Sequence, residues 1–266
     1  MTRIAGVAGQ PIARSLSPLI HGAWLAAAGV DALYTAYGPA DAAGFAALVD
    51  EGRRGRIRGL NVTAPFKEQA LALADEATAT ARACGSANLL LFEAGGVFAD
   101  STDGSGLMAA LAEQAPDLDL DGRAVVVLGA GGAARAAVVA LITAGARVTV
   151  LNRTRSRAET LAADLGATVG EPEALSGANL AVNALSVPPA IDLSILPADA
   201  VVMDMTYRPL QTPFLAVARA RGLTTVDGLA MLIGQARPSF AALFGMEPPD
   251  IDVRSLALVA LGEAGR

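Results

Sequence analysis

An unbroken apolar run at residues 124–128 leads directly into a glycine-rich turn at residues 129–134. A short apolar run of this kind is typical of a strand buried on both faces of a parallel sheet. The turn is followed by residues of helical pattern up to Ala144, and a second strand is predicted at residues 147–151. Strand, glycine turn, helix and strand within about 30 residues form a βαβ unit. This pattern favours an α/β fold with a doubly wound sheet of Rossmann type.

The turn has the spacing Gly-x-Gly-x-x-Ala between a strand and a helix, the context in which this motif binds dinucleotides. Gly129 permits the tight turn, Gly131 lets the backbone approach a pyrophosphate, and Ala134 keeps helix and strand close. The amides at the helix N-terminus then hold the phosphates. The predicted cofactor-binding residues here are Gly129, Ala130, Gly131, Gly132 and Ala133. A glycine turn without any ligand is the alternative.

The end of the next strand distinguishes between cofactors. An NAD site has an acidic residue there to accept from the ribose hydroxyls, but residues 151–157 contain no acid and three arginines. Because arginine binds a phosphate in bidentate fashion, the sequence favours NADP over NAD. The residues predicted to contribute are Asn152, Arg153, Thr154 and Arg157. A solvated basic loop is the alternative interpretation.

The first hundred residues also alternate between predicted strands and helices, and polar side chains follow two of the strands. Ser15 and Ser17 come after the strand at residues 4–8, and Pro18 predicts a helix that begins with Ser17 as N-cap. Thr63 and Lys67 come after the strand at residues 57–62, and a helix is predicted at residues 67–77. Ligands of open α/β sheets bind at the carboxyl ends of strands, and hydroxyls at a helix N-terminus suit a carboxylate.

Lys67 is the single lysine among 20 basic residues, the other 19 being arginine. Lysine can exchange its proton near neutral pH when its pKa is lowered, whereas arginine cannot. This contrast makes Lys67 a candidate acid or base, the alternative being chance on a solvated helix. Asp103, taken by itself, is interpreted as the cap of the helix that follows.

Composition excludes several classes of protein. With 53% apolar and 17% charged residues the chain can form a core, and a net charge of −6 argues against a nucleic-acid binder. No apolar stretch is long enough to cross a membrane. One cysteine, Cys84, and one histidine, His21, leave no disulfide and no expected metal site. We therefore expect a cytoplasmic protein with a small-molecule substrate, and we expect His21 to be structural.

Breaks in the pattern divide the chain. Residues 101–104 interrupt it, residues 116–123 are polar, and further strands are predicted at residues 180–183, 201–204 and 225–226. Helices are predicted at residues 229–244 and 253–264. We predict a substrate domain at residues 1–102, a nucleotide domain at residues 103–236, and C-terminal helices at residues 237–266 that pack on the first domain.

Seven segments, in this order and spacing, resemble the shikimate dehydrogenase family over nearly the full length. They are SLSPLIH (15–21), GLNVTAPFK (59–67), STDG (101–104), GAGGA (129–133), NRT (152–154), NALS (183–186) and DGLAMLIGQA (227–236). The resemblance implies an N-terminal substrate domain and a C-terminal NADP domain with a cleft between them. It implies reversible reduction of 3-dehydroshikimate to shikimate on the route to aromatic amino acids, by a monomer or homodimer.

Site residues follow from the same resemblance. Lys67 and Asp103 would be the catalytic pair, with the residue that moves the proton left open. Met205 and Gly228 would flank the nicotinamide. The implied substrate-binding residues are Ser15, Ser17, Thr63, Lys67, Asn88, Asp103, Tyr207 and Gln235.

Several positions depart from the family pattern, among them Arg14, Gly22, Ser101 and Leu185, and the segment at residues 84–88 is looser than usual. They leave Lys67 and Asp103 untouched, but they are compatible with altered substrate affinity or with a paralogue. The alternatives are a quinate or quinate/shikimate dehydrogenase that uses NAD, and a non-catalytic nucleotide-binding regulator. A regulator is expected to have lost the catalytic pair, whereas both members are present here.

Overall fold

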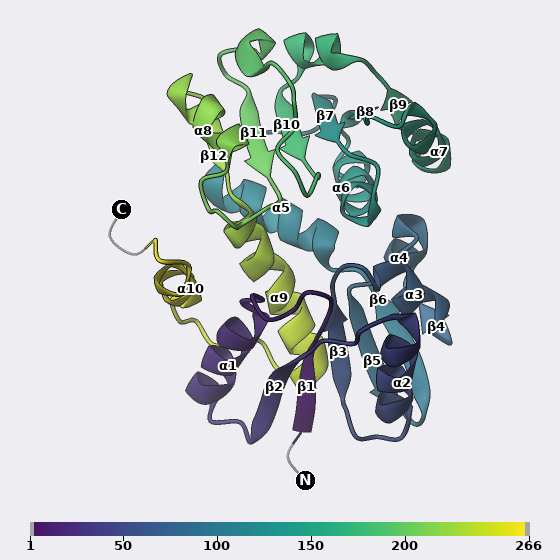
Figure 1. Cartoon of the computed structure of the whole chain (residues 1–266). Helices are drawn as coiled ribbons and strands as arrows, with labels where there is room; N and C mark the ends of the chain where they lie inside the picture. Colours follow the sequence, from purple (N-terminus) through teal and green to yellow (C-terminus); the bar gives the residue numbers. More distant parts are fainter. Residues whose placement is uncertain (1–2, 264–266) are drawn as a thin grey trace. The chain divides into compact units, whose positions relative to one another are not determined.

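A computed structural model describes residues 3–263 of the chain. The chain forms two compact units, one of residues 1–102 and 235–266 and the other of residues 103–234. Both units are layered α/β structures, each with its own six-stranded sheet (Figure 1). Each unit is described by itself below.

Unit 1 has a mixed sheet in the order β2-β1-β3-β5-β6-β4. Its strands are β1 (Arg3–Ala8), β2 (Ala32–Tyr37), β3 (Gly59–Val62), β4 (Glu76–Ala77), β5 (Leu89–Glu93) and β6 (Gly96–Asp100). β1 pairs in parallel with β2 and β3, whereas β5 is antiparallel to β3 and β6. A tight hairpin turn joins β5 to β6, with Ala94 and Gly95 both at positive φ, as a turn of this kind requires.

Helices cover the sheet of unit 1. They are α1 (Ser17–Ala28), α2 (Ala42–Arg53), α3 (Lys67–Ala72), α4 (Ala79–Cys84), the second half of α9 (Gly228–Phe244) and α10 (Val253–Leu261). α10 contacts α1, as Figure 1 shows. Two aromatic stacks fill the core: the Phe45 and Phe66 rings lie 4.9 Å apart, and His21 stacks on Tyr34 at 4.0 Å.

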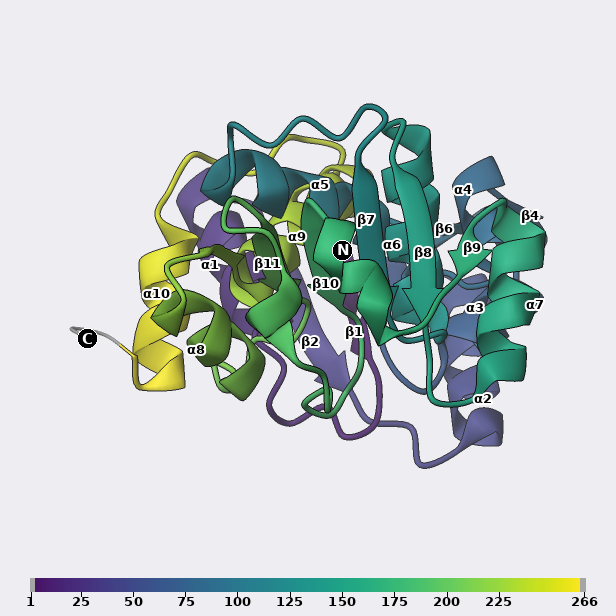
Figure 2. The ribbon, with the colours of Figure 1, turned by 90° about the horizontal axis from the view of Figure 1, so that it is seen from above.

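Unit 2 has the expected all-parallel sheet, in the order β12-β11-β10-β7-β8-β9, and Figure 2 shows it from β11 to β9. Its strands are β7 (Ala124–Leu128), β8 (Arg147–Leu151), β9 (Thr168–Val169), β10 (Leu180–Asn183), β11 (Val201–Asp204) and β12 (Thr224–Val226). The chain direction across the sheet reverses between β7 and β10, which is where doubly wound sheets bind ligands.

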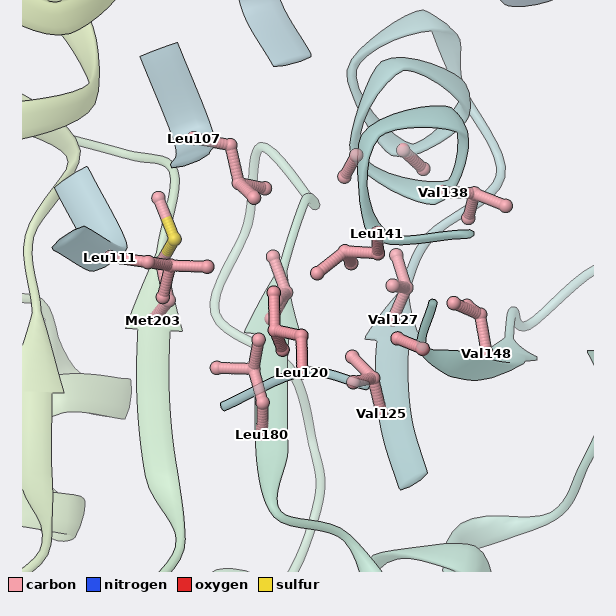
Figure 3. Close-up of a cluster of buried hydrophobic side chains, with 14 of the residues drawn as sticks. Leu107, Leu111, Leu120, Val125, Val127, Val138, Leu141, Val148, Leu180 and Met203 are labelled. Atoms are coloured by element: carbon pink, nitrogen blue, oxygen red, sulfur yellow. The ribbon is translucent and has the colours of Figure 1, made fainter. Parts of the chain in front are cut away.

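The helices of unit 2 are α5 (Asp103–Gln114), α6 (Gly132–Thr143), α7 (Arg155–Leu165), α8 (Pro213–Ala220) and the first half of α9, with 3-10 turns η1 (Pro172–Gly177) and η2 (Leu193–Ile195). Side chains of α5, α6 and the sheet interlock in one apolar cluster (Figure 3). Leu141 of α6 is fully buried in this cluster, as is Val127 of β7. This packing holds α6 against β7.

Several predicted boundaries were wrong. The helix predicted at residues 67–77 stops at Ala72, and Glu76–Ala77 instead forms an edge strand on β6. α5 begins at Asp103, although residues 101–104 were predicted as a break, and α7 begins at Arg155, within the stretch for which a basic loop was the alternative interpretation. Of the C-terminal helix predicted at residues 253–264, Ala264 lies outside the described residues. No helix among residues 3–263 is both long and apolar enough to cross a membrane.

Candidate active site

The nucleotide turn has the geometry that the glycine spacing predicts. Gly129 directly follows β7 and has a φ of +118°, and its amide donates to the Leu151 carbonyl at 2.8 Å. A Cβ at Gly129 would lie 3.2 Å from Leu185, so the turn packs tightly on that side. Gly131 differs, because no described atom lies within 4 Å of the place where its Cβ would be. Its absent side chain leaves room for a ligand, beside a helix N-terminus without a side-chain cap.

The arginines after β8 fall into two kinds. Arg155 forms ion pairs with Glu159, at 3.0 Å, and with Glu171, so its charge is already neutralised within the protein. Arg153 and Arg157 are exposed, and within residues 3–263 no carboxylate pairs with either. Arg153 directly precedes the N-cap residue of α7, Thr154, and Arg157 lies in the first turn of this helix. The Thr154 side chain makes no capping hydrogen bond. Free guanidinium groups at a helix N-terminus fit the 2′-phosphate that distinguishes NADP from NAD.

A close backbone contact joins the end of β11 to the start of α9. A Cβ at Gly228 would lie 2.6 Å from the Met205 carbonyl oxygen, so only glycine lets the two segments touch. Asp227 caps α9 by accepting from the Leu229 and Ala230 amides at 3.0 and 2.9 Å. Met205 and Gly228, both predicted to flank the nicotinamide, are therefore neighbours. Tyr207 lies two residues beyond Met205 and is half-buried.

In unit 1 the polar residues predicted from strand ends share one edge of the sheet. Ala8 and Val62 pair in register, so β1 and β3 end side by side. The loops that follow are tied together by the Gln10 amide, which donates to the Ala64 carbonyl at 3.0 Å. These two loops, with the first residues of the helices that follow them, carry the hydroxyl-bearing and basic residues of the prediction: Ser15, Ser17, Thr63 and Lys67.

Ser17 is not the N-cap of α1, contrary to the sequence prediction. Leu16 holds that position and makes no side-chain cap, and Ser17 is the first helical residue. The Ser15 hydroxyl instead accepts from the Ser17 amide at 3.3 Å, while the Ser17 side chain lies beside the Tyr34 phenol. The two serines thus present two hydroxyls at a helix N-terminus, a donor set suited to a carboxylate.

A third group of predicted residues meets beside β5. The Asn88 amide nitrogen donates to Gln235 Oε1 at 3.0 Å and to Thr102 Oγ1 at 2.9 Å. The Lys67 carbonyl accepts from the Ala87 amide at 2.9 Å. The backbone of Lys67 is therefore fixed one residue from Asn88, and Asp103 directly follows Thr102 in the chain. Sequence reasoning did not select Thr102, whose only signal was its place in the STDG segment.

Two of the departures from the family pattern have structural consequences. The Ser101 hydroxyl is buried and has no hydrogen-bond partner among the described residues. Gly22, on α1, has no described atom within 4 Å of its Cβ position, so a larger side chain fits there. No group of three metal-ligating side chains gathers in residues 3–263.

A parallel sheet with an open glycine turn at its switch point and free arginines after the next strand defines the class of dinucleotide-binding dehydrogenases. Known proteins place the chain more narrowly within this class. A family model described as the shikimate dehydrogenase substrate binding domain matches residues 7–90, and one described as shikimate / quinate 5-dehydrogenase matches residues 110–187. A shikimate dehydrogenase (NADP(+)) of Caulobacter vibrioides is 54% identical over 98% of this chain and 96% of its own.

Solved structures agree with this placement. Shikimate 5-dehydrogenase from Thermus thermophilus, in complex with NADP(H) and shikimate, superposes with a TM-score of 0.86 at 38% identity, covering 94% of this chain and 95% of its own. Quinate dehydrogenase from Corynebacterium glutamicum, in complex with NAD, gives 0.84 at 31% identity, with 93% and 95% covered. The chain belongs to the shikimate/quinate dehydrogenase family.

Proposed function

We propose that the chain catalyses the NADP-dependent, reversible reduction of 3-dehydroshikimate to shikimate. The observation that carries the proposal is the shared edge at β1 and β3. There the register of Ala8 with Val62 brings two helix-end hydroxyls together with the loop that holds the only lysine. Hydroxyls and amides suit a carboxylate and ring hydroxyls, and a lysine suits an oxygen that gains negative charge.

The cofactor residues support NADP as the dinucleotide. Gly129–Ala133 would hold the pyrophosphate, Asn152, Thr154, Arg153 and Arg157 the adenosine 2′-phosphate, and Met205 and Gly228 the nicotinamide. When bound, NADPH supplies the hydride that reduces the ketone.

Lys67 and Asp103 are proposed to act on the substrate oxygen. Reduction places negative charge on that oxygen, and the Lys67 ammonium donates to it while Asp103 keeps the lysine charged and oriented. Oxidation reverses the step, with the pair accepting the hydroxyl proton. Ser15 and Ser17 would hold the carboxylate, and Thr63, Asn88, Tyr207 and Gln235 the ring hydroxyls. We further propose that the protein works in the cytoplasm as a monomer or homodimer, with its one cysteine, Cys84, buried and outside any disulfide.

Initial rates of shikimate oxidation test the proposal, with NADP⁺ or NAD⁺ as cofactor and shikimate or quinate as substrate. We expect a fast rate with NADP⁺ and shikimate. Lys67→Met should lower kcat by at least about 100-fold, the usual contribution of a positioned acid or base. Lys67→Arg keeps the charge but cannot give up its proton, so it separates charge from proton transfer.

Each outcome has a distinct meaning. A rate only with quinate or NAD⁺ would assign the chain to the quinate-specific members of the family. A wild-type protein inactive with all four pairs, or a Lys67→Met protein as fast as wild type, would refute the proposed function.

A further inference from the structure

A network of buried, hydrogen-bonded polar side chains runs through the core of unit 1 behind the proposed substrate residues. Tyr34, Asn61, Thr102 and Ser239 come from four separate segments, and each is at most 5% exposed. Buried polar groups cost stability unless every one is hydrogen-bonded, and an apolar core would avoid that cost. This network ends at Tyr34 on one side and at the half-buried Gln235 on the other.

Asn61 has only one possible orientation. Its Nδ2 faces the Asn88 backbone carbonyl at 3.2 Å, and a carbonyl can only accept. Its Oδ1 therefore faces the Tyr34 hydroxyl at 2.8 Å, so that Tyr34 donates. Burial raises the pKa of Tyr34 well above its ordinary value, so the phenol keeps its proton.

The orientation of Asn88 is fixed in the same way. The Thr102 amide, which can only donate, lies 2.7 Å from Asn88 Oδ1. Asn88 Nδ2 is then the atom that meets Gln235 at 3.0 Å, so the Gln235 atom it meets must be the accepting Oε1. Gln235 consequently turns its oxygen inward and keeps both Nε2 protons for another partner.

Ser239 joins the two ends. It is fully buried on α9, one turn after Gln235, and its hydroxyl accepts from Asn61 Nδ2 at 2.9 Å. The same oxygen lies 3.0 Å from the Gln235 carbonyl and 3.2 Å from Thr102 Oγ1. Removing this one oxygen takes away one of the two acceptors of Asn61 Nδ2 and lets Thr102 and Gln235 reorient.

We propose that Ser239, with Asn61 and Tyr34, is a positioning residue that holds Gln235 so that its amide NH₂ donates to a substrate hydroxyl. This inference rests on the proposed function, because it assigns Gln235 to the substrate. It explains why a network of polar side chains crosses the core of unit 1.

The test is Ser239→Ala, a change that helices favour and that removes only the oxygen. We expect the KM for shikimate to rise roughly five- to tenfold, the factor for one neutral hydrogen bond, with kcat and the KM for NADP⁺ unchanged. Tyr34→Phe should act in the same direction, and Ser239→Thr should restore binding. The matched control is Thr143→Ala, which removes a helix hydroxyl bonded to the carbonyl four residues earlier on α6.

A double-mutant cycle gives the decisive result. In a Gln235→Ala background, Ser239→Ala should leave the KM for shikimate unchanged, because its effect passes through Gln235. Equal effects of Ser239→Ala in both backgrounds, or an unchanged KM in the wild-type background, would overturn the inference while leaving the proposed function intact. A wild-type protein that does not oxidise shikimate would instead overturn the proposed function and this inference with it.

Discussion

Acid should destabilise unit 1 through one buried histidine. His21 is fully buried, stacks on Tyr34 at 4.0 Å, and neither of its ring nitrogens has a hydrogen-bond partner among the described residues. Burial lowers the pKa of His21 to about 3, because the apolar surroundings disfavour the imidazolium. The Arg237 guanidinium lies over the neighbouring Trp24 ring, 5.8 Å from its centroid.

The sign and size of the effect follow from linkage. Between pH 3 and 6.5 the unfolded chain binds a proton at His21 that the folded chain does not, so stability falls as the pH drops below 6.5. Each pH unit costs up to about 1.4 kcal/mol, so the loss is about 1.4 kcal/mol at pH 5.5 and about 2 kcal/mol at pH 5.0. Above pH 7.5 this histidine contributes almost no pH dependence.

Trp24 provides the assay, because it is the only tryptophan and is fully buried 5.6 Å from His21. Urea unfolding followed by its fluorescence should be compared at pH 7.5, 5.5 and 5.0 for wild type and His21→Leu. The carboxylates titrate alike in both proteins, so the difference in unfolding free energy isolates His21. We expect the variant to gain about 2 kcal/mol relative to wild type between pH 7.5 and 5.0. A difference that stays constant over this range would refute the reasoning.

Two matched pairs of substitutions extend the tests. Gly22→Ala should stabilise unit 1 by about 0.5–1 kcal/mol, because α1 has open space there and alanine favours helix. Gly52→Ala in α2 should destabilise unit 1 by about 1–3 kcal/mol, since the new Cβ would lie 2.4 Å from the Phe92 ring. If the urea midpoints of Gly22→Ala and Gly52→Ala move in the same direction, the result contradicts the packing described here. Arg153→Ser should raise the KM for NADP⁺ by about 10- to 100-fold and leave that for NAD⁺ unchanged. Arg155 is already paired with Glu159 and Glu171, so Arg155→Ser should leave the ratio of the KM for NADP⁺ to the KM for NAD⁺ unchanged. Equal effects of the Arg153 and Arg155 substitutions on this ratio would argue against a specific phosphate contact.

Local patterns predicted the nucleotide-binding part of unit 2 well. β7, the turn at Gly129, α6 and β8 are contiguous in sequence, and each element depends on residues within it. The local pattern could not show that, among the described residues, Arg155 forms ion pairs within the protein whereas Arg153 does not. The partner Glu171 lies 16 residues beyond Arg155 and becomes a neighbour only after α7 folds back beside β9.

Unit 1 shows the opposite case, where tertiary contacts overrule local preference. Ser17 and Pro18 have the sequence of a capped helix start, yet Leu16 takes the N-cap position and the Ser17 side chain lies beside Tyr34 of β2. A polar Asn61 within an apolar strand was the only local signal of the buried network. Its partner Ser239 lies 178 positions away, so no spacing rule connects them.

That separation has a consequence for how the protein is made. Unit 1 needs residues from both ends of the chain, and its core includes Phe240 and Leu243, both fully buried. At about 5–20 residues per second, the ribosome needs roughly 7–26 seconds to synthesise the intervening residues 103–234. Unit 2 is contiguous and is nearly complete when α9 begins to emerge, while the first hundred residues still lack the helix that closes their core. The unit that starts last along the chain is therefore the one that can finish folding first.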